Sequence, residues 1–171
     1  MSLLFLLVIA SFHSLVFSLH NVTIGSQDPA THYSGNWSMT NTSAGYGLMI
    51  SRDRSAFATF TFTGLFSSTL KLKVPLTAHP FTGVAVYYVA PLWPYKVTTE
   101  VCLDSHAGIP IDLQDHSGTV GLTVPAAPRW GMTGLKNTSH PLIVYTEANG
   151  SYIVVDSFMY AFIFQTLSYL N

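Results

Sequence analysis

The sequence predicts an all-β domain with the form of a jelly-roll-like β-sandwich. In residues 56–64, the apolar side chains of Ala58, Phe60 and Phe62 alternate with threonines, which is the period of a strand with one buried face. Further short runs of β-branched and aromatic residues follow, bounded by glycines and prolines. No stretch keeps the period of an amphipathic helix. A length of 171 residues suits a single domain.

Strand-like runs occupy most of the chain between an irregular lead-in, residues 19–30, and a C-terminal tail, residues 164–171. A single sandwich domain is therefore expected over residues 31–163. Its strands are expected at 31–37, 56–64, 83–90, 96–103, 109–113, 119–124, 142–146 and 152–163, and residues 48–50 form a further short apolar run.

Several features predict export from the cell. Residues 3–10 form an apolar run of signal-peptide length, and Val16 and Ser18 suit cleavage after Ser18, so a signal peptide is expected over residues 1–18. An uncleaved anchor is the alternative, because residues 3–19 carry no charge. Five glycosylation sequons begin at Asn21, Asn36, Asn41, Asn137 and Asn149. We therefore expect a secreted, extracellular glycoprotein.

The low content of charged residues limits the classes of function. Charged residues make up 9% of the chain, against roughly 25% in typical soluble proteins, and the formal net charge is -1. The seven Lys and Arg residues are scattered and form no basic stripe, which argues against a nucleic-acid partner. Cys102 is the one cysteine, so no internal disulfide is possible. A buried, inert thiol is expected, with an intermolecular bridge as the alternative.

Four residues are candidate ligand contacts. Sugar binding needs flat apolar rings with polar groups at their rims, which tryptophan and tyrosine provide. Two prolines flank Trp93 and are expected to end a strand, leaving Trp93 and Tyr95 in a stiff loop that limits the ordering cost of binding. A second pair of prolines introduces an expected loop with Arg129 and Trp130. The alternative is that all three rings close the ends of the sandwich core, where Trp37 is also expected.

The carboxylates give no catalytic motif. Acid–base cleavage of a glycan requires two carboxylates facing one substrate, and those available lie near expected strand ends or turns: Glu100, Asp104, Asp112, Asp115, Glu147 and Asp156. Residues 104–106 and 112–116 could offer oxygen ligands to calcium, but solvated loops are the simpler interpretation. No zinc, phosphate-loop or nucleophile-elbow motif is present. We therefore expect no catalytic and no metal-binding residues.

The order of several short motifs resembles one protein family. These motifs are Tyr33–Trp37, Ala56–Gly64, Val84–Tyr87, Val101–Asp104, Leu135–Val144 and Tyr152–Tyr160. They recur in this order in the galactose-binding-domain-like β-sandwich ectodomains of secreted and single-pass membrane proteins of basidiomycete fungi, which the chain resembles over roughly residues 28–160. The resemblance implies a galactose-binding-domain-like fold and a carbohydrate or cell-surface glycan as the partner. It also allows a structural calcium ion, which this fold often carries.

The chain departs from the family pattern in two places. Family members run from Phe-Thr-Gly almost directly into the Val-Ala-Val-Tyr strand, whereas seventeen residues intervene here. We interpret residues 65–81 as a retained intron in the gene model, with a hairpin insertion as the alternative. Family ectodomains are often followed by a stalk, a membrane helix and a cytoplasmic tail. The closing apolar run here is too short to cross a membrane, which predicts no span in the mature chain.

Together these observations predict a secreted, non-catalytic module that binds carbohydrate at the cell wall or another surface, through Trp93, Tyr95, Arg129 and Trp130. The alternative is a structural or protein-interaction ectodomain without a sugar ligand. In that case, replacing Trp93 or Trp130 causes no loss of binding. A glycan-active hydrolase is the third hypothesis, and it requires two convergent carboxylates in a cleft.

Overall fold

The computed structural model describes residues 13–41, 47–63, 84–118, 123–146 and 152–169, which form strands and turns with no helix. The strands are β1 (His13–Gly25), β2 (Thr31–Ser34), β3 (Ser38–Asn41), β4 (Gly47–Ser51), β5 (Phe57–Thr63), β6 (Val84–Leu92), β7 (Thr98–Leu103), β8 (Ile109–Asp112), β9 (Val124–Leu135), β10 (Ser139–Tyr145), β11 (Ile153–Val155) and β12 (Ser157–Tyr169). The predicted all-β class is therefore confirmed. These segments contain no helix able to cross a membrane.

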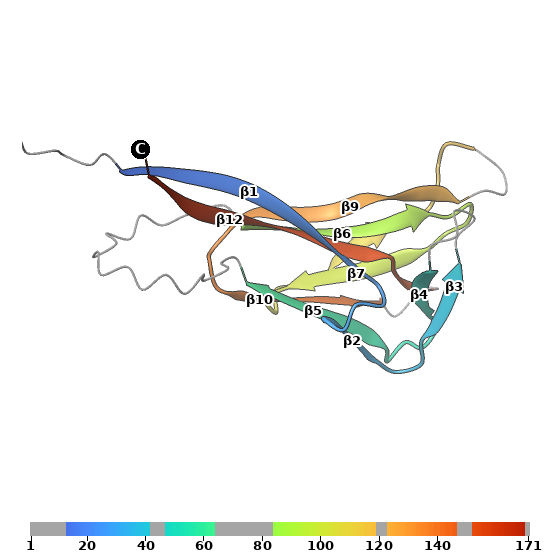
Figure 1. Ribbon diagram of the computed structural model, residues 1–171. Helices are drawn as coiled ribbons and strands as arrows, with labels where there is room; N and C mark the ends of the chain where they lie inside the picture. The colour runs from blue at the N-terminus through green and yellow to red at the C-terminus, as the bar shows by residue number, and fades with distance from the viewer. Residues whose placement is uncertain (1–12, 42–46, 64–83, 119–122, 147–151, 170–171) are drawn as a thin grey trace, which may run out of the picture.

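The strands form two facing sheets and a smaller third one (Figure 1). The first sheet has the order β1-β12-β6-β9, and the second has the order β2-β5-β10-β7-β8. The third, β11-β4-β3, closes one end of the molecule. All the strand pairs within these sheets are antiparallel. Two antiparallel layers packed face to face make a β-sandwich, as the sequence predicted.

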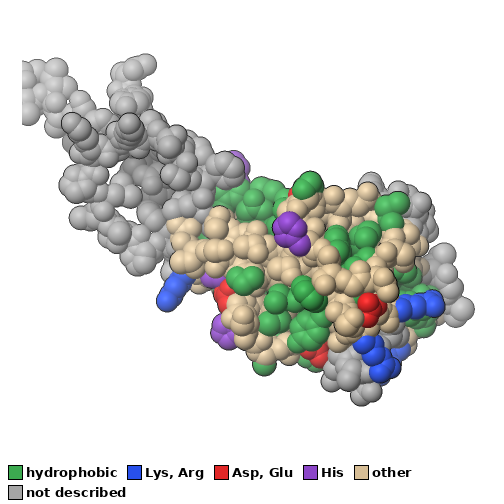
Figure 2. Space-filling view, turned by 90° about the horizontal axis from the view of Figure 1, so that it is seen from below, with side chains coloured by type: hydrophobic (Ala, Val, Ile, Leu, Met, Phe, Trp, Pro, Cys, Tyr) green, Lys and Arg blue, Asp and Glu red, His purple; other side chains and the backbone are tan. Residues whose placement is uncertain are grey.

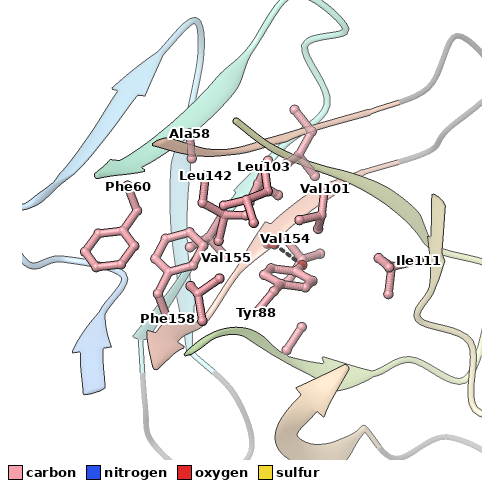
Figure 3. Packing of buried hydrophobic residues seen from close by; sticks show 14 of the residues in the cluster. Ala58, Phe60, Tyr88, Val101, Leu103, Ile111, Leu142, Val154, Val155 and Phe158 are labelled. Carbon is pink, nitrogen blue, oxygen red and sulfur yellow. Dashed lines mark hydrogen bonds between the residues drawn. The ribbon is translucent and has the colours of Figure 1, made fainter. Parts of the chain in front are cut away.

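The core lies between the two large sheets and takes alternate residues from their strands. On β5, Ala58, Phe60 and Phe62 are buried, whereas Phe57 and the threonines face outward, so the alternation is confirmed. Phe60 stacks on Phe158 of β12 with ring centroids 5.0 Å apart, as Figure 3 shows. This aromatic pair joins the central strand to the opposite sheet.

Tyr88 of β6 carries a polar group into the core, and it is the largest fully buried side chain among the described residues. Its hydroxyl donates a hydrogen bond to the Val154 carbonyl of β11 (Figure 3). Burial raises the pKa of Tyr88 above its ordinary range, so the hydroxyl stays protonated. The neighbouring Tyr87 is only half-buried, as expected for successive residues of a strand. The hydrogen bond ties the third sheet to the first.

The prolines do not end strands where the sequence suggested. β6 continues past Pro91, and β9 includes both Pro125 and Pro128. The expected loop around Arg129 and Trp130 is therefore wrong. β9 is an edge strand and pairs with β6 through several register shifts, so a proline there can leave its missing N–H on the unpaired side.

The last expected strand, residues 152–163, is in fact split between two sheets. β11 ends at Val155 and belongs to the third sheet, and β12 begins at Ser157 and belongs to the first. Asp156 is the crossing point, and its carbonyl accepts a hydrogen bond of 2.8 Å from the Ser26 N–H. No glycine or proline marks the crossing, so the sequence gives no sign of it.

Both ends of the expected domain extend further than the sequence indicated. Residues 19–25, expected as irregular lead-in, belong to β1, and residues 164–169 of the expected tail belong to β12. The two strands pair from His13 opposite Tyr169 to Gly25 opposite Ser157. β1 therefore begins inside the range expected for the signal peptide. These residues form strands because they pair with a segment far away in the chain, which their local sequence does not predict.

Other expectations concern single residues. Trp37, expected in the core, is half-buried at its edge, where its ring meets Tyr33 edge-on at 4.8 Å and its Nε1 donates to the Ser34 carbonyl at 2.8 Å. Cys102 is a buried free thiol, as expected, and it donates to the His106 carbonyl at 2.9 Å. The insertion at residues 65–81 lies outside the described residues.

Candidate functional site

The candidate site begins with two residues at the ends of paired strands. Ser51, the last residue of β4, pairs with Ile153, the first residue of β11. Arg52 and Tyr152 flank that pair and therefore meet across the antiparallel ladder. The Arg52 Cζ lies 4.9 Å from the Tyr152 ring centroid, and Nη2 donates a hydrogen bond of 2.8 Å to the Tyr152 hydroxyl. A cation–π attraction and a hydrogen bond thus act on the same pair.

Trp93 and Tyr95 follow β6 and extend the aromatic surface. The Trp93 and Tyr95 ring centroids are 5.7 Å apart, and those of Tyr95 and Tyr152 are 6.3 Å apart. Hydrogen bonds fix the Trp93 backbone, from its N–H to the Leu113 carbonyl at 2.8 Å and from the Asp115 N–H to its carbonyl at 2.7 Å. Tyr95 is 47% exposed and Trp93 is half-buried. Backbone hydrogen bonds thus hold Trp93, and the contacts between rings continue from it to Tyr95 and Tyr152.

These rings border a hollow of about 180 Å³. An adjoining hollow of about 400 Å³ shares Ile50 and Arg52 with it and extends to Asn36 and Trp37. Among the described residues, no carboxylate lines either hollow. We call this surface the aromatic–arginine site, and define it by Trp37, Arg52, Trp93, Tyr95 and Tyr152.

Two polar groups of the site are donors that no carboxylate satisfies. The Trp93 Nε1–H is buried and has no hydrogen-bond partner in the described part of the chain. Arg52 is exposed and forms no ion pair with a described carboxylate. The adjacent Asp53 turns elsewhere, because hydrogen bonds from Ser55 and from the Asn36 N–H hold its carboxylate and lower its pKa.

Both basic and acidic side chains lie at the end of the molecule that carries this site (Figure 2). On the face drawn in Figure 2, most of the Lys and Arg side chains lie near the end of the molecule that carries β3 and β4 in Figure 1. Burial, followed by the nearby Tyr152, raises the pKa of Tyr95, and Arg52 partly offsets this shift. The Tyr95 hydroxyl is therefore neutral and can donate or accept.

Two of the four predicted contact residues lie elsewhere. The Arg129 guanidinium donates to the Ala90 carbonyl at 2.8 Å and to the Pro125 carbonyl at 3.0 Å, and its partial burial lowers its pKa. Trp130 lies opposite Tyr88 in the ladder and packs against the core. Neither residue lines the two hollows of the aromatic–arginine site. Arg129 thus uses its donors to hold the irregular pairing of β9 with β6.

The sequence pattern did not reveal Arg52 and Tyr152 as site residues. They are 100 positions apart in the chain, and only the pairing of β4 with β11 brings them together. The available signal was weak. Each residue flanks a short apolar run, and an arginine or tyrosine beside a strand is common on protein surfaces.

A third hollow, of about 760 Å³, lies where the β1–β2 connection faces β9. Its lining includes Asp28, Pro91, Pro125 and the half-buried Asp156, but no aromatic ring from the described residues. Burial raises the pKa of Asp156, and the Ser157 hydroxyl, which donates to its carboxylate at 3.1 Å, partly offsets this shift. Without rings, this larger hollow suits a pyranose face less well than the aromatic–arginine site.

We expect Asp156→Asn to raise the melting temperature at neutral pH. Because burial raises the carboxyl pKa, the folded protein binds a proton more tightly than the unfolded chain, and stability falls as the pH rises through this range. The asparagine removes the charge and can still accept from Ser157. Thermal unfolding in the presence of a chelator checks this result, and the difference from wild type should vanish below about pH 4, where both states are protonated. A lower melting temperature for Asp156→Asn at neutral pH would contradict it.

The loops considered for metal binding do not assemble a ligand set. Asp104 Oδ2 lies 2.7 Å from His140 Nδ1, and Asp112 Oδ2 lies 2.9 Å from His116 Nε2. His116, followed by the Gln114 N–H, lowers the pKa of Asp112. No three His, Cys, Asp or Glu side chains in the described segments are placed to share one ion. The structural calcium ion that the family resemblance allows stays a prediction, because backbone carbonyls can also serve as its ligands.

Three of the five sequon asparagines have exposed side chains: Asn21 on β1, Asn36 after β2 and Asn137 before β10. An N-linked glycan requires this exposure, and modification stays a prediction. Asn36 also lines the adjoining hollow, so a glycan there would stand beside the aromatic–arginine site. The side chains of Asn41 and Asn149 lie outside the described residues.

Solved structures with a similar fold come from carbohydrate-active enzymes. The exo-β-1,3-galactanase of Phanerochaete chrysosporium aligns with a TM-score of 0.51 and 10% identity, over 82% of this chain and 29% of the enzyme. The GH26-CBM35 β-(1,4)-mannanase of Podospora anserina aligns with a TM-score of 0.51 and 17% identity, over 88% of this chain and 28% of the enzyme. The chain thus spans less than a third of either enzyme, and the likeness confirms the β-sandwich fold alone. No protein-family model and no curated protein matches the sequence.

Proposed function

We propose that the protein is a secreted, non-catalytic glycoprotein module that binds carbohydrate at the fungal cell wall or another glycan-covered surface. The observation that carries this proposal is the aromatic–arginine site, in which three rings and a guanidinium border one hollow on a fixed backbone. Apolar ring faces suit the faces of a pyranose, and the hydroxyl and guanidinium groups at their rims suit its edges.

Four further observations support the proposal. Solved structures that share the fold include a galactanase and a mannanase, both of which act on glycans. The motif order resembles that of fungal cell-surface ectodomains, and the exposed sequons Asn21, Asn36 and Asn137 agree with passage through the secretory route. A site of a few hundred Å³ at a surface suits one or two sugar units rather than a deeply enclosed substrate.

We expect Tyr152→Ala and Tyr95→Ala each to weaken binding to a retained polysaccharide by about 1–2 kcal/mol, roughly 10-fold in Kd. Each change removes a ring that borders the hollow, and Tyr95 is exposed enough for its loss to leave the fold intact. Affinity electrophoresis in gels containing galactan, mannan or fungal cell-wall glucan measures the effect, on protein without N-glycans so that Asn36 stays bare.

Phe57→Ala is the matched control, because Phe57 is an exposed ring, 41% accessible, on the outer side of β5 and outside the site. It should migrate like wild type. Folded wild-type protein that no polysaccharide retards would refute the proposal and favour the protein-interaction alternative. Equal losses for Phe57→Ala and Tyr152→Ala would place the sugar elsewhere.

A further inference from the structure

We propose that the aromatic–arginine site selects glycans that carry an anionic group, either the carboxylate of a uronic acid or a sulfate ester. This inference rests on the proposed function, since it names the class of sugar that the same site takes. Three features carry it: an uncompensated guanidinium, a buried donor without a partner, and a lining without carboxylates.

Arg52 has donors to spare. Its Nη2 donates to the Tyr152 hydroxyl, and no hydrogen bond from its other nitrogens to a described residue is found. The Arg52 Cζ lies over the Tyr152 ring, and the residue lines both hollows. A guanidinium with free N–H groups on two nitrogens matches two oxygens of a carboxylate or sulfate. An arginine serving only the fold would have its donors satisfied by the protein, as Arg129 does.

Trp93, whose side chain lines the same hollow, carries a buried Nε1–H without a partner in the described part of the chain. A buried N–H without a partner lowers stability, and an oxygen acceptor on a ligand or an ordered water would relieve this cost. The indole N–H and the guanidinium group can donate hydrogen bonds but cannot accept them, so both require acceptors. A neutral sugar hydroxyl could satisfy Trp93, but only an anionic group also neutralises Arg52.

The surroundings favour an anion over a cation or a neutral ligand. No described carboxylate lines either hollow, and the adjacent Asp53 is held by Ser55 and the Asn36 N–H. The next basic residue, Arg54, is exposed and lines neither hollow. Arg52 is therefore the one charged side chain among the described residues that line the two hollows, and its charge attracts an anion.

Paired probes that differ only in charge test the inference. Polygalacturonate is compared with its methyl ester, and dextran sulfate with dextran, by affinity electrophoresis at physiological salt, where diffuse surface attraction is screened. We expect an acidic form to be retained at least about 10-fold more tightly than its neutral counterpart. Preference within the first pair identifies a carboxylate, and preference within the second identifies a sulfate.

Arg52→Gln should abolish that preference, whereas Arg54→Gln, which changes the net charge equally, should preserve it. Arg52→Lys keeps the charge without the planar fork and should retain only part of the preference. Equal retention of acidic and neutral forms by wild type, or equal loss in Arg52→Gln and Arg54→Gln, would overturn the inference. If wild type retains neutral and acidic glycans equally, and Tyr152→Ala loses that retention, the proposed function stands while the anion preference fails. If no glycan of either kind is retained, both fail.

Discussion

Replacing Phe158 by alanine is expected to destabilise the domain by about 3–5 kcal/mol, which is a large part of the stability of a typical domain. Phe158 is fully buried, stacks on Phe60 at 5.0 Å with an interplanar angle of 5°, and meets Tyr88 at 6.3 Å. Its removal leaves a cavity that rings from both sheets line and that cannot close without moving β5 or β6. Urea unfolding followed by circular dichroism measures the loss.

Phe57→Ala is the control for this change, since it deletes the same side chain from an exposed position. Phe57 lies on β5 beside the core-facing Ala58 but points to the outer face of the sheet. We expect it to cost less than about 1 kcal/mol. Similar losses for Phe57→Ala and Phe158→Ala would mean that the Phe-Thr alternation does not separate a core face from an outer face.

The second large effect is expected for His140→Ala, which should lower the free energy of unfolding by about 2–3 kcal/mol. His140 is buried, its Nδ1 lies 2.7 Å from Asp104 Oδ2, and its Nε2 lies 2.6 Å from the Lys136 carbonyl. Its ring also stacks on Phe62 at 5.5 Å. The pair holds Asp104 in a left-handed conformation, with φ of 54°, at the turn after β7. Alanine would leave a partly buried carboxylate without its partner.

His116→Ala tests whether burial sets this cost, because His116 and Asp112 form the other His–Asp pair of the described residues. That pair has a distance of 2.9 Å, but its side chains are 69% and 56% exposed. Water competes for both groups, so we expect at most about 1 kcal/mol. Thermal unfolding of both variants side by side gives the comparison. Equal losses from the two histidines would show that burial of His140 is not the cause.

The alternation of residues 56–64 was enough to predict the central strand and its core face, because a strand buries every second side chain whatever it pairs with. The same alternation allows only one of Tyr87 and Tyr88 to face the core, and the structure shows that it is Tyr88. The reasoning failed at Asp156, where one apolar run passes from the third sheet to the first. A change of sheet depends on contacts far away in the chain, and an uninterrupted run carries no sign of it.

Prolines gave the wrong boundaries for a related reason. Pro125 and Pro128 would end a strand only if a partner strand required a backbone N–H at their positions. An edge strand has a partner on one side only, so a proline can be accommodated there. Arg129 and Trp130 therefore moved from a predicted surface loop to a strand whose contacts hold the sheet. Whether a strand lies at an edge is a property of the whole sheet, and no local pattern reports it.

By itself, the sequence determined the all-β class, the core-facing residues of the central strand, and the presence of Trp93 and Tyr95 in one short segment, because each of these depends on neighbours in the chain. Only the tertiary structure decided which polar groups join those rings. Arg52 meets Tyr152 because β4 pairs with β11, and Arg129 is withdrawn because β9 pairs with β6. A binding surface is made by strand pairing, and pairing partners 100 residues apart leave no periodic trace in the sequence.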